Sequence, residues 1–196
     1  MEIIPVTLQG FRIRLEPLAL DRHFEGLAEI ALEPELWRWT LNVVETRDDL
    51  LQYLHKALDT QAKGEALPFA TVDRATGRAL GCTRFGNIEP EHRRVEIGWT
   101  WVGRAFQRTH VNTEAKYLML SHAFDTWHCG RVELKTNALN RRSRDAILRI
   151  GAKEEGTLRK HAISDRGVVR DTVYFSITDD EWPEVKARLE SMLAAR

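Results

Sequence analysis

Alternation and helical spacing of apolar side chains predict strands and helices in turn along the first third of the chain. Residues 11–18 alternate apolar and charged side chains, as a half-buried strand does. Apolar residues within 24–31 recur instead at the spacing of one helix face. Thr46 precedes an acidic pair and the leucines of 50–58, a pattern typical of a capped helix with one buried face. We therefore expect one strand followed by two helices.

The middle of the chain predicts a sheet, because β-branched and aromatic residues are frequent there. Turn residues 74–77 separate two strand-like runs and indicate a hairpin, and residues 93–102 predict a longer strand. The remaining expected elements are a helix at 112–127, a strand at 131–136, a helix at 141–150 closed by Gly151, strands around 151–158 and 172–177, and a helix at 183–195. This order predicts an α+β fold with a predominantly antiparallel sheet.

Composition and charge are those of an ordinary globular domain. The chain has 196 residues, 43% hydrophobic and 30% charged, without a repeat, a low-complexity tract or a linker, so we expect a single domain over residues 1–196. Basic and acidic residues both number 29, so we expect neither nucleic acid nor a membrane as a direct partner. No run of about 18 apolar residues predicts a membrane span.

Cysteine and N-terminal patterns bear on the compartment. Cys82 and Cys129 lie far apart, without CxxC spacing or a Cys/His cluster, which suits a reducing compartment and argues against a structural zinc site. Glu2 follows Met1, and the first residues lack the basic ones of a signal peptide. We expect a cytoplasmic protein that uses no metal and buries both cysteines as small side chains.

The loop between the strand at 93–102 and the following helix has the chemistry of an anion site. The first amides of a helix lack intrahelical acceptors and carry the positive end of its dipole, so residues 107–113 can cradle a phosphate. Arg104 and Arg108 add charged donors nearby. The pattern alone leaves open whether these residues bind a phosphate or only cap a surface helix.

The same loop resembles the pyrophosphate loop of the GNAT superfamily, whose pattern is Gln/Arg-x-x-Gly-x-Gly/Ala. Gln107 fills the first position, while His110 and Asn112 stand where small residues are usual. Around it the chain is similar to the RimJ/RimL-type branch of that superfamily, in the segments RRVEIGWTW, NTEAK, HAFD, RVELKT, NRRSRDAILRIGAKEEGTLRKH and RDTVYFSITDDEWPEVK. The resemblance covers nearly the whole chain. It implies the GNAT fold, a mixed and mostly antiparallel sheet flanked by helices, with acetyl-CoA as the acyl donor.

The resemblance also implies a set of cofactor-binding residues. In the superfamily the strand before the loop splays at a bulge, and its backbone bonds the pantetheine arm, which corresponds here to Trp101 and Val102. An NxxS segment, residues 140–143 here, opens a later helix beside the thioester and contacts the cofactor, which adds Asn140. The full set is Trp101, Val102, Gln107, Arg108, Thr109, His110, Val111, Asn112, Thr113 and Asn140.

By the same resemblance, Glu96 is the carboxylate that accepts a proton from the attacking amine. A carboxylate at the base of an apolar cleft has a raised proton affinity, as a general base near neutral pH requires. The alternative is a solvated or salt-bridged strand residue beside Arg93 and Arg94.

Ser143, the last residue of the NxxS segment, is the candidate that stabilises the departing thiolate. Many members of the superfamily carry an acidic tyrosine one turn further along, where this chain has Ile147. A serine is a poor acid, so its expected contribution is a hydrogen bond or a bound water. The alternative is that Ser143 only caps the helix.

These residues predict direct acetyl transfer to an amine within a ternary complex. The resemblance suggests as acceptor a protein N-terminus, especially of a ribosomal protein, or a small-molecule amine, and related proteins are often homodimers. Trp37 and Trp39 either cover the acceptor cleft or pack in the core. A different class of function is also open: a catalytically weak CoA-binding module that acts as a sensor or assembly partner.

Overall fold

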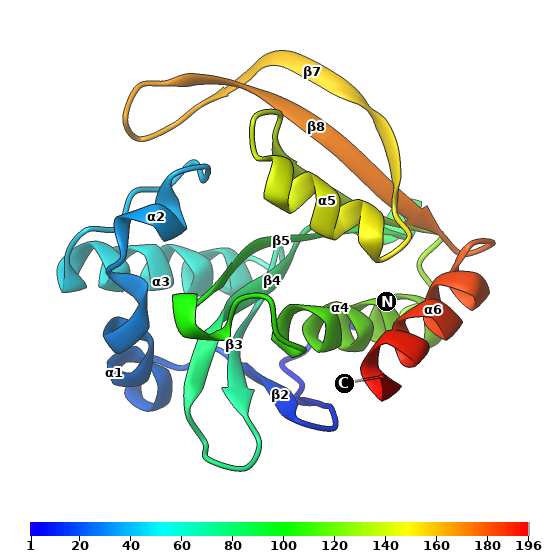
Figure 1. The fold of residues 1–196 in the computed structure, drawn as a ribbon, viewed down its shortest axis with the longest axis horizontal. Coiled ribbons are helices and arrows are strands. Elements are labelled where there is room, and N and C mark those ends of the chain that lie inside the picture. The colour runs from blue at the N-terminus through cyan, green and yellow to red at the C-terminus, as the bar shows by residue number, and fades with distance from the viewer. Residues whose placement is uncertain (196) are drawn as a thin grey trace.

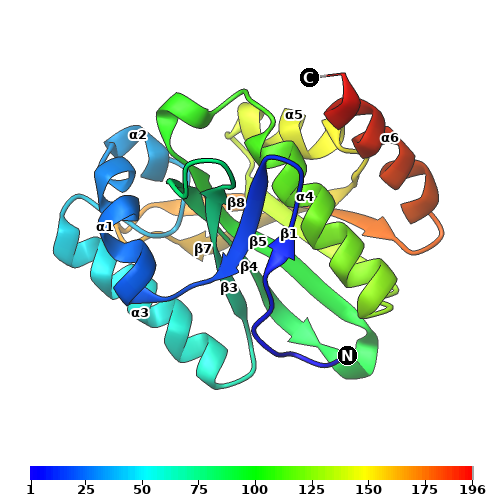
Figure 2. The same ribbon diagram turned by 90° about the horizontal axis from the view of Figure 1, so that it is seen from below.

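The structure, a computed structural model, describes residues 1–195 as one sheet with helices against both faces (Figures 1 and 2). The strands are β1 (Leu8–Gln9), β2 (Ile13–Pro17), β3 (Leu67–Asp73), β4 (Ala79–Glu89), β5 (Arg94–Val102), β6 (Arg131–Asn137), β7 (Lys153–Ile163) and β8 (Val169–Thr178). The α-helices are α1 (Leu20–Ala31), α2 (Pro34–Trp37), α3 (Arg47–Ala62), α4 (Val111–Ser121), α5 (Arg141–Arg149) and α6 (Trp182–Ala194). Short helical turns are η1 (Pro90–His92), η2 (Arg104–Phe106) and the π-turn η3 (His122–Thr126).

The strands lie in the order β1-β2-β3-β4-β5-β6-β8-β7. Every neighbouring pair in this sheet is antiparallel except β5 and β6, which run parallel. That parallel pairing is short, from Arg94 opposite Arg131 to Glu96 opposite Glu133. The mixed, mostly antiparallel α+β sheet that the sequence predicts is confirmed, and its one parallel junction ends at Glu96.

Two hydrophobic cores lie on opposite faces of the sheet. Side chains of α4, α5 and α6 pack against one face, with Met119 and Phe175 fully buried among them. Side chains of α1 and α3 pack with Trp37 against the other face. Figure 2 shows these two groups of helices on either side of the strands. The sheet is therefore packed between two groups of helices.

Strand β5 carries the bulge that the resemblance implies. Its pairing with β4 shifts register, so Trp99 and Thr100 together lie opposite Thr83. Trp99 has a φ of 49°, in the left-handed region. A Cβ on Gly86 would lie 2.3 Å from the Trp99 ring, so a glycine is needed beside the bulge. The bulge turns the end of β5 away from β6.

Local sequence signals of caps and turns are confirmed. Thr46 and Asp49 form a reciprocal capping box at the start of α3. Gly151 follows α5 with a φ of 103°. The hairpin turn lies between β3 and β4, where Asp73 accepts bonds from the amides of Ala75 and Thr76.

Other elements differ from the expected ones. The helix expected to continue to Trp127 ends at Ser121 and widens into the π-turn η3. Strands β7 and β8 extend beyond the expected residues. The sequence pattern missed the end of β7 because this exposed edge strand lacks apolar alternation. The short elements β1 and α2 were not expected, since two and four residues carry no periodicity. None of the helices within residues 1–195 combines the length and apolar character needed to cross a bilayer.

Candidate active site

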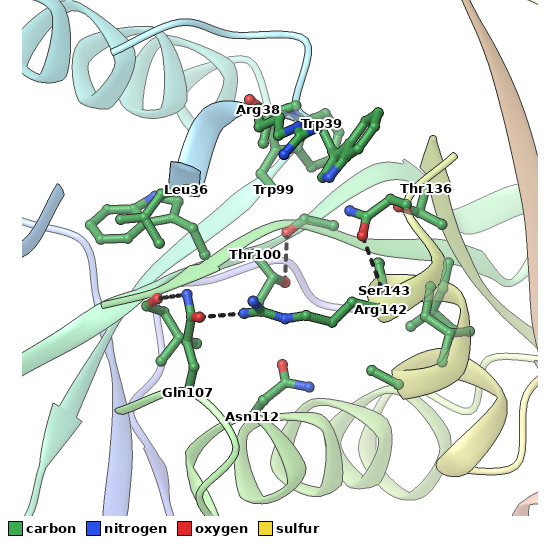
Figure 3. A pocket seen from close by; sticks show the side chains of 18 of the residues that line it. Leu36, Arg38, Trp39, Trp99, Thr100, Gln107, Asn112, Thr136, Arg142 and Ser143 are labelled. Atoms are coloured by element: carbon green, nitrogen blue, oxygen red, sulfur yellow. Dashed lines mark hydrogen bonds between the residues drawn. The ribbon is translucent and has the colours of Figure 1, made fainter. Parts of the chain in front are cut away.

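A cavity of about 1520 Å³ opens where β5 and β6 separate. Residues 97–102 of β5 form one wall and residues 134–136 of β6 the other. Helices α4 and α5 and the loop 107–109 enclose one end, while residues 35–42 and Arg170 lie at the opposite end. Figure 3 shows side chains from these separate elements facing a common space. The volume suits a ligand larger than an ordinary small molecule.

One end of the cavity combines a helix N-terminus with arginines. Helix α4 begins at Val111, and Asn112 in its first turn points into the cavity (Figure 3). Arg108, Arg141 and Arg142 line the same end. Unpaired amides, the helix dipole and guanidinium groups together favour an anion such as a phosphate. The predicted anion site is therefore built from two helices, since Arg141 and Arg142 come from α5.

The Gln107 side chain fixes the loop. Its amide nitrogen donates to the Val102 carbonyl at 2.8 Å, and its amide oxygen accepts from Arg142 (Figure 3). This bridge joins the end of β5 to the first turn of α5. Gln107 thus holds Arg142 at the cavity. The Val102 carbonyl, which no β6 amide reaches, is bonded by the Gln107 side chain.

Three of the predicted cofactor residues have side chains that do not line the cavity. Val111 and Thr113 are buried, and the Thr113 hydroxyl accepts from Arg149 at 2.9 Å. The His110 ring is also absent from the lining, and its Nε2 atom is buried without a hydrogen-bond partner. Gln107, Arg108, Thr109 and Asn112 do line it. Any contribution of residues 110, 111 and 113 must come from their backbone amides.

Glu96 lies where β5 and β6 part, but its surroundings are not the apolar ones expected. Its side chain is 3% exposed, and one carboxylate oxygen lies 2.8 Å from Lys135 Nζ. The same oxygen accepts from Asn87 Nδ2 at 2.7 Å. Burial lowers the pKa of Arg170, and the charge of Glu96 opposes that shift, which places a second cation near the carboxylate. Glu96 is therefore ion-paired, with Lys135 rather than with Arg93 or Arg94.

Asn140, not Ser143, caps helix α5. The Asn140 side-chain oxygen accepts from the Ser143 amide at 3.1 Å. The interpretation of Ser143 as a cap is therefore wrong, because Ser143 supplies the backbone donor in this contact. Ser143 itself lines the cavity (Figure 3), and its candidate role at the thiolate stays a prediction.

Lys116, which the sequence analysis missed, also lines the cavity. It lies one turn after Asn112 on α4, and its Nζ donates to Thr100 Oγ1 at 2.8 Å. Burial lowers the pKa of Lys116 to about 7. The detectable signal was its position four residues after Asn112, since residues at that spacing share a helix face.

Trp37 and Trp39, which precede α3, differ in burial. Trp37 is 1% exposed and packs edge-on against Tyr53, with its Nε1 donating to the Ala31 carbonyl at 2.7 Å. Trp39 is partly exposed and lies at the cavity beside Trp99 (Figure 3). Trp37 thus packs in the core and also borders the cavity, whereas Trp39 lines the cavity as a partly exposed side chain.

Both cysteines are buried outside the cavity. Burial raises the pKa of the Cys82 thiol to about 12 and that of the Cys129 thiol to about 11. Both thiols are therefore protonated at neutral pH and poor nucleophiles. Within residues 1–195, no group of three or more His, Cys, Asp or Glu side chains forms a candidate metal site.

The fold and the cavity together define a class, the CoA-dependent acyltransferases whose sheet splays around the donor. Residues 12–153 match the family of the acetyltransferase (GNAT) domain. The chain belongs to this family. The fold and the enzyme class implied by the resemblance, an acyl-CoA-dependent acyltransferase, are confirmed.

Relatives and solved structures agree with this family. A crystal structure of a putative acetyltransferase from T. thermophilus is 35% identical, with a TM-score of 0.89 over 98% of this chain and 100% of that one. A putative ribosomal N-acetyltransferase, YdaF of Bacillus subtilis (strain 168), is 30% identical over 54% of this chain and only 57% of its own length. Mycobacterium smegmatis RimJ, solved in complex with CoA-disulfide, is 23% identical and shares the fold, with a TM-score of 0.80 over 96% of this chain and 95% of that one. These relatives agree with the acetyltransferase (GNAT) family, and the RimJ structure shows the same fold.

Proposed function

We propose that this protein is an N-acetyltransferase that moves an acetyl group from acetyl-CoA to a primary amine by direct attack in a ternary complex. The observation that carries the proposal is the cavity between the separated ends of β5 and β6, with a helix N-terminus and arginines at one end and Glu96 at the other. Acetyl-CoA matches this arrangement, with its phosphates at the arginine end, its linear arm along the cavity and its thioester near Glu96.

The acyl donor occupies the cavity lengthwise in this proposal. The amides at the start of α4 and the guanidinium groups of Arg108, Arg141 and Arg142 bind the pyrophosphate. The pantetheine arm lies along Trp101 and Val102, since β6 does not pair with this end of β5. The CoA-disulfide named for the RimJ structure supports CoA as the ligand of this fold.

Glu96 and Ser143 serve the two ends of the reaction. Glu96 accepts the proton of the attacking amine, directly or through a water, and Lys135 holds the carboxylate in place at 2.8 Å. The Ser143 hydroxyl gives a hydrogen bond at the leaving sulfur, either directly or through a water. Nitrogen bonds the acetyl carbon, the carbon–sulfur bond breaks, and CoA leaves as a thiolate, which then takes up a proton to become the thiol.

The acceptor is an amine that enters from the side of Trp39 and Trp99. Their faces and Arg170 form the wall opposite the phosphate end. The relative named a putative ribosomal N-acetyltransferase favours a protein N-terminus in the cytoplasm, with a small-molecule amine as the alternative. A homodimer is compatible with the exposed edge strand β7, which carries Leu158 and Ile163.

An acceptor screen tests the proposal. Purified protein is incubated with acetyl-CoA and amino acids, polyamines, aminoglycosides or N-terminal peptides, and free CoA and acetylated product are measured. We expect amine-dependent CoA release with at least one acceptor class. Tight CoA binding without transfer to any acceptor would instead favour a CoA-binding sensor or assembly module, to which the replacement of a tyrosine by Ile147 gives some support.

A further inference from the structure

Lys116 is a buried cation for which the reaction above has no role. The residue is 6% exposed, and within the described part of the chain no carboxylate pairs with it. Its Nζ donates to Thr100 Oγ1 at 2.8 Å, and that hydroxyl also bonds Thr83 Oγ1 at 2.8 Å. A charged amine without an anion is costly to bury, so its place in a reactive cavity calls for a reason.

The charged groups nearby are engaged elsewhere. Glu114 of α4 accepts from the backbone amides of Arg12 and Ile13. Arg149 of α5 donates to the Thr113 hydroxyl, and Glu96 of β5 is paired with Lys135. Burial is therefore the cause that lowers the pKa of Lys116 to about 7.

The position of Thr100 along β5 locates Lys116 relative to the donor. The pantetheine arm lies at Trp101 and Val102, and the attacking amine lies at Glu96. The thioester must join these two points, so it lies at the bulge between residues 98 and 100. Lys116 reaches this bulge through its bond to Thr100.

We propose that Lys116 is the acid that protonates the departing CoA thiolate, and this inference rests on the acetyl transfer proposed above. In the superfamily a tyrosine commonly supplies this proton from the helix that is α5 here, but Ile147 stands at that position and lines the cavity. Ser143 is too weak an acid to replace the tyrosine. Lys116 supplies the proton from α4 instead.

The proton balance of the step is complete. The amine nitrogen bonds the acetyl carbon, the carbon–sulfur bond breaks, and its electron pair stays on sulfur. The Lys116 ammonium gives a proton to that sulfur, which yields CoA thiol and a neutral lysine. The proton lost by the attacking amine leaves through Glu96 to solvent, and solvent returns a proton to Lys116.

The acid role has a defined pH signature. The attacking amine must be neutral, so turnover rises with pH at first. Lys116 must be charged, so turnover falls again as pH rises through its pKa, which burial lowers to about 7 in the free protein. The profile is therefore bell-shaped, and its descending limb belongs to Lys116.

Two substitutions separate an acid from a structural hydrogen-bond donor. Lys116→Met removes both the proton and the bond to Thr100, while Lys116→Gln keeps an amide donor for Thr100 but has no acidic proton. Lys63→Met, at the exposed C-cap residue after α3, is the matched control. Turnover from about pH 6 to pH 10 and the Kd for acetyl-CoA are measured on wild type and all variants, across the reference lysine pKa of about 10.4.

We expect kcat to fall about 100-fold in both Lys116 variants, a typical contribution of general acid catalysis, with the descending limb lost and the Kd little changed. Lys63→Met should match wild type in every measurement. Near-normal turnover of Lys116→Gln, or a descending limb that persists in both variants, would overturn the acid role while leaving acetyl transfer intact. A wild type that binds acetyl-CoA but acetylates no acceptor would overturn the proposed function and this inference together.

Discussion

At the scale of single residues, the Glu96–Lys135 ion pair fixes the position of the proposed general base. The Lys135 ammonium, 2.8 Å away, holds the Glu96 carboxylate in a fixed position. Asn87 adds a second bond to the same oxygen, Oε2, at 2.7 Å. Positioning of the carboxylate is therefore the basis of its proposed role.

Glu96→Gln tests that role. The change keeps the shape but removes the proton acceptor, and we expect kcat to fall about 100-fold near neutral pH with little change in the Kd for acetyl-CoA. Glu91→Gln, at an exposed position on η1, is the control. Wild-type turnover by Glu96→Gln would assign the base to a water or another carboxylate.

The buried Lys116 also has a consequence for stability that does not depend on activity. Its pKa is about 7 in the folded protein and about 10.4 in an unfolded chain. The burial cost is fully present below pH 7, and between these two values the unfolded state binds more protons. The free energy of unfolding therefore rises with pH in this window, by up to about 1.4 kcal/mol per pH unit.

Lys116→Met should abolish this slope. We expect the variant to be more stable than wild type at about pH 6, because the uncompensated buried charge is gone, and the difference to shrink as pH rises above about 7. Urea unfolding across this range measures both curves. Parallel curves would contradict a lowered pKa for Lys116.

His110 departs from the small residue usual in this loop, yet the structure gives it an ordinary backbone. Its φ is −67°, so the position does not need a glycine. Because its ring does not line the cavity, we expect His110→Gly to leave the Kd for acetyl-CoA nearly unchanged. Titration calorimetry on both sides of the reference histidine pKa of about 6.5 checks this. A histidine-dependent gain in affinity at low pH would show that the ring contacts phosphate.

At the scale of single elements, the first turn of α5 links the cap, the arginines and the candidate serine. Asn140 closes the helix end through the Ser143 amide, and Arg142 of the same turn reaches Gln107 in the loop before α4. This contact ties two helix N-termini together across the cavity. The geometry of the anion site therefore depends on the cap of α5.

Asn140→Ala should cost about 1 kcal/mol of stability, as the loss of an N-cap does. Ser143→Ala should cost less than about 0.5 kcal/mol, because its contribution to the cap is a backbone amide. Urea unfolding without a ligand compares the two variants. An equal cost would mean that the Ser143 hydroxyl also stabilises the helix end.

The sequence was a good guide to elements that carry a strong local signal. The capping box of Thr46, the hairpin turn and the glycine after α5 all depend on neighbours within a few residues, and each lies as expected. The π-turn after α4 and the exposed strand β7 were not predictable, because tertiary contacts decide where a helix widens and how far an edge strand extends.

The candidate site was predictable only in part, for the same physical reason. Motif positions such as Gln107, Asn112 and Glu96 lie at the cavity. Their partners come from distant segments: Lys135 at Glu96, and Arg142 at Gln107. A sequence pattern gives spacing within one element, and it does not give which side chains of other elements meet there.

At the scale of the whole molecule, the site exists because one parallel strand pair is short. Elsewhere each neighbouring pair of strands is antiparallel, and both faces are covered by packed helices. Strands β5 and β6 pair only as far as Glu96 and separate beyond it, toward the bulge at Trp99 and the loop that precedes α4. A long ligand can therefore enter between two strands without disturbing either hydrophobic core.

Binding of acetyl-CoA is the measurement that tests this account most directly, because it needs no knowledge of the acceptor. A ligand that binds only the folded state stabilises it by about 2.7 kcal/mol at a concentration of 100 Kd. We predict saturable binding of one acetyl-CoA per chain by calorimetry, with a rise in melting temperature as ligand is added. No heat of binding and no change in melting temperature at millimolar acetyl-CoA would contradict the assignment of the cavity between β5 and β6.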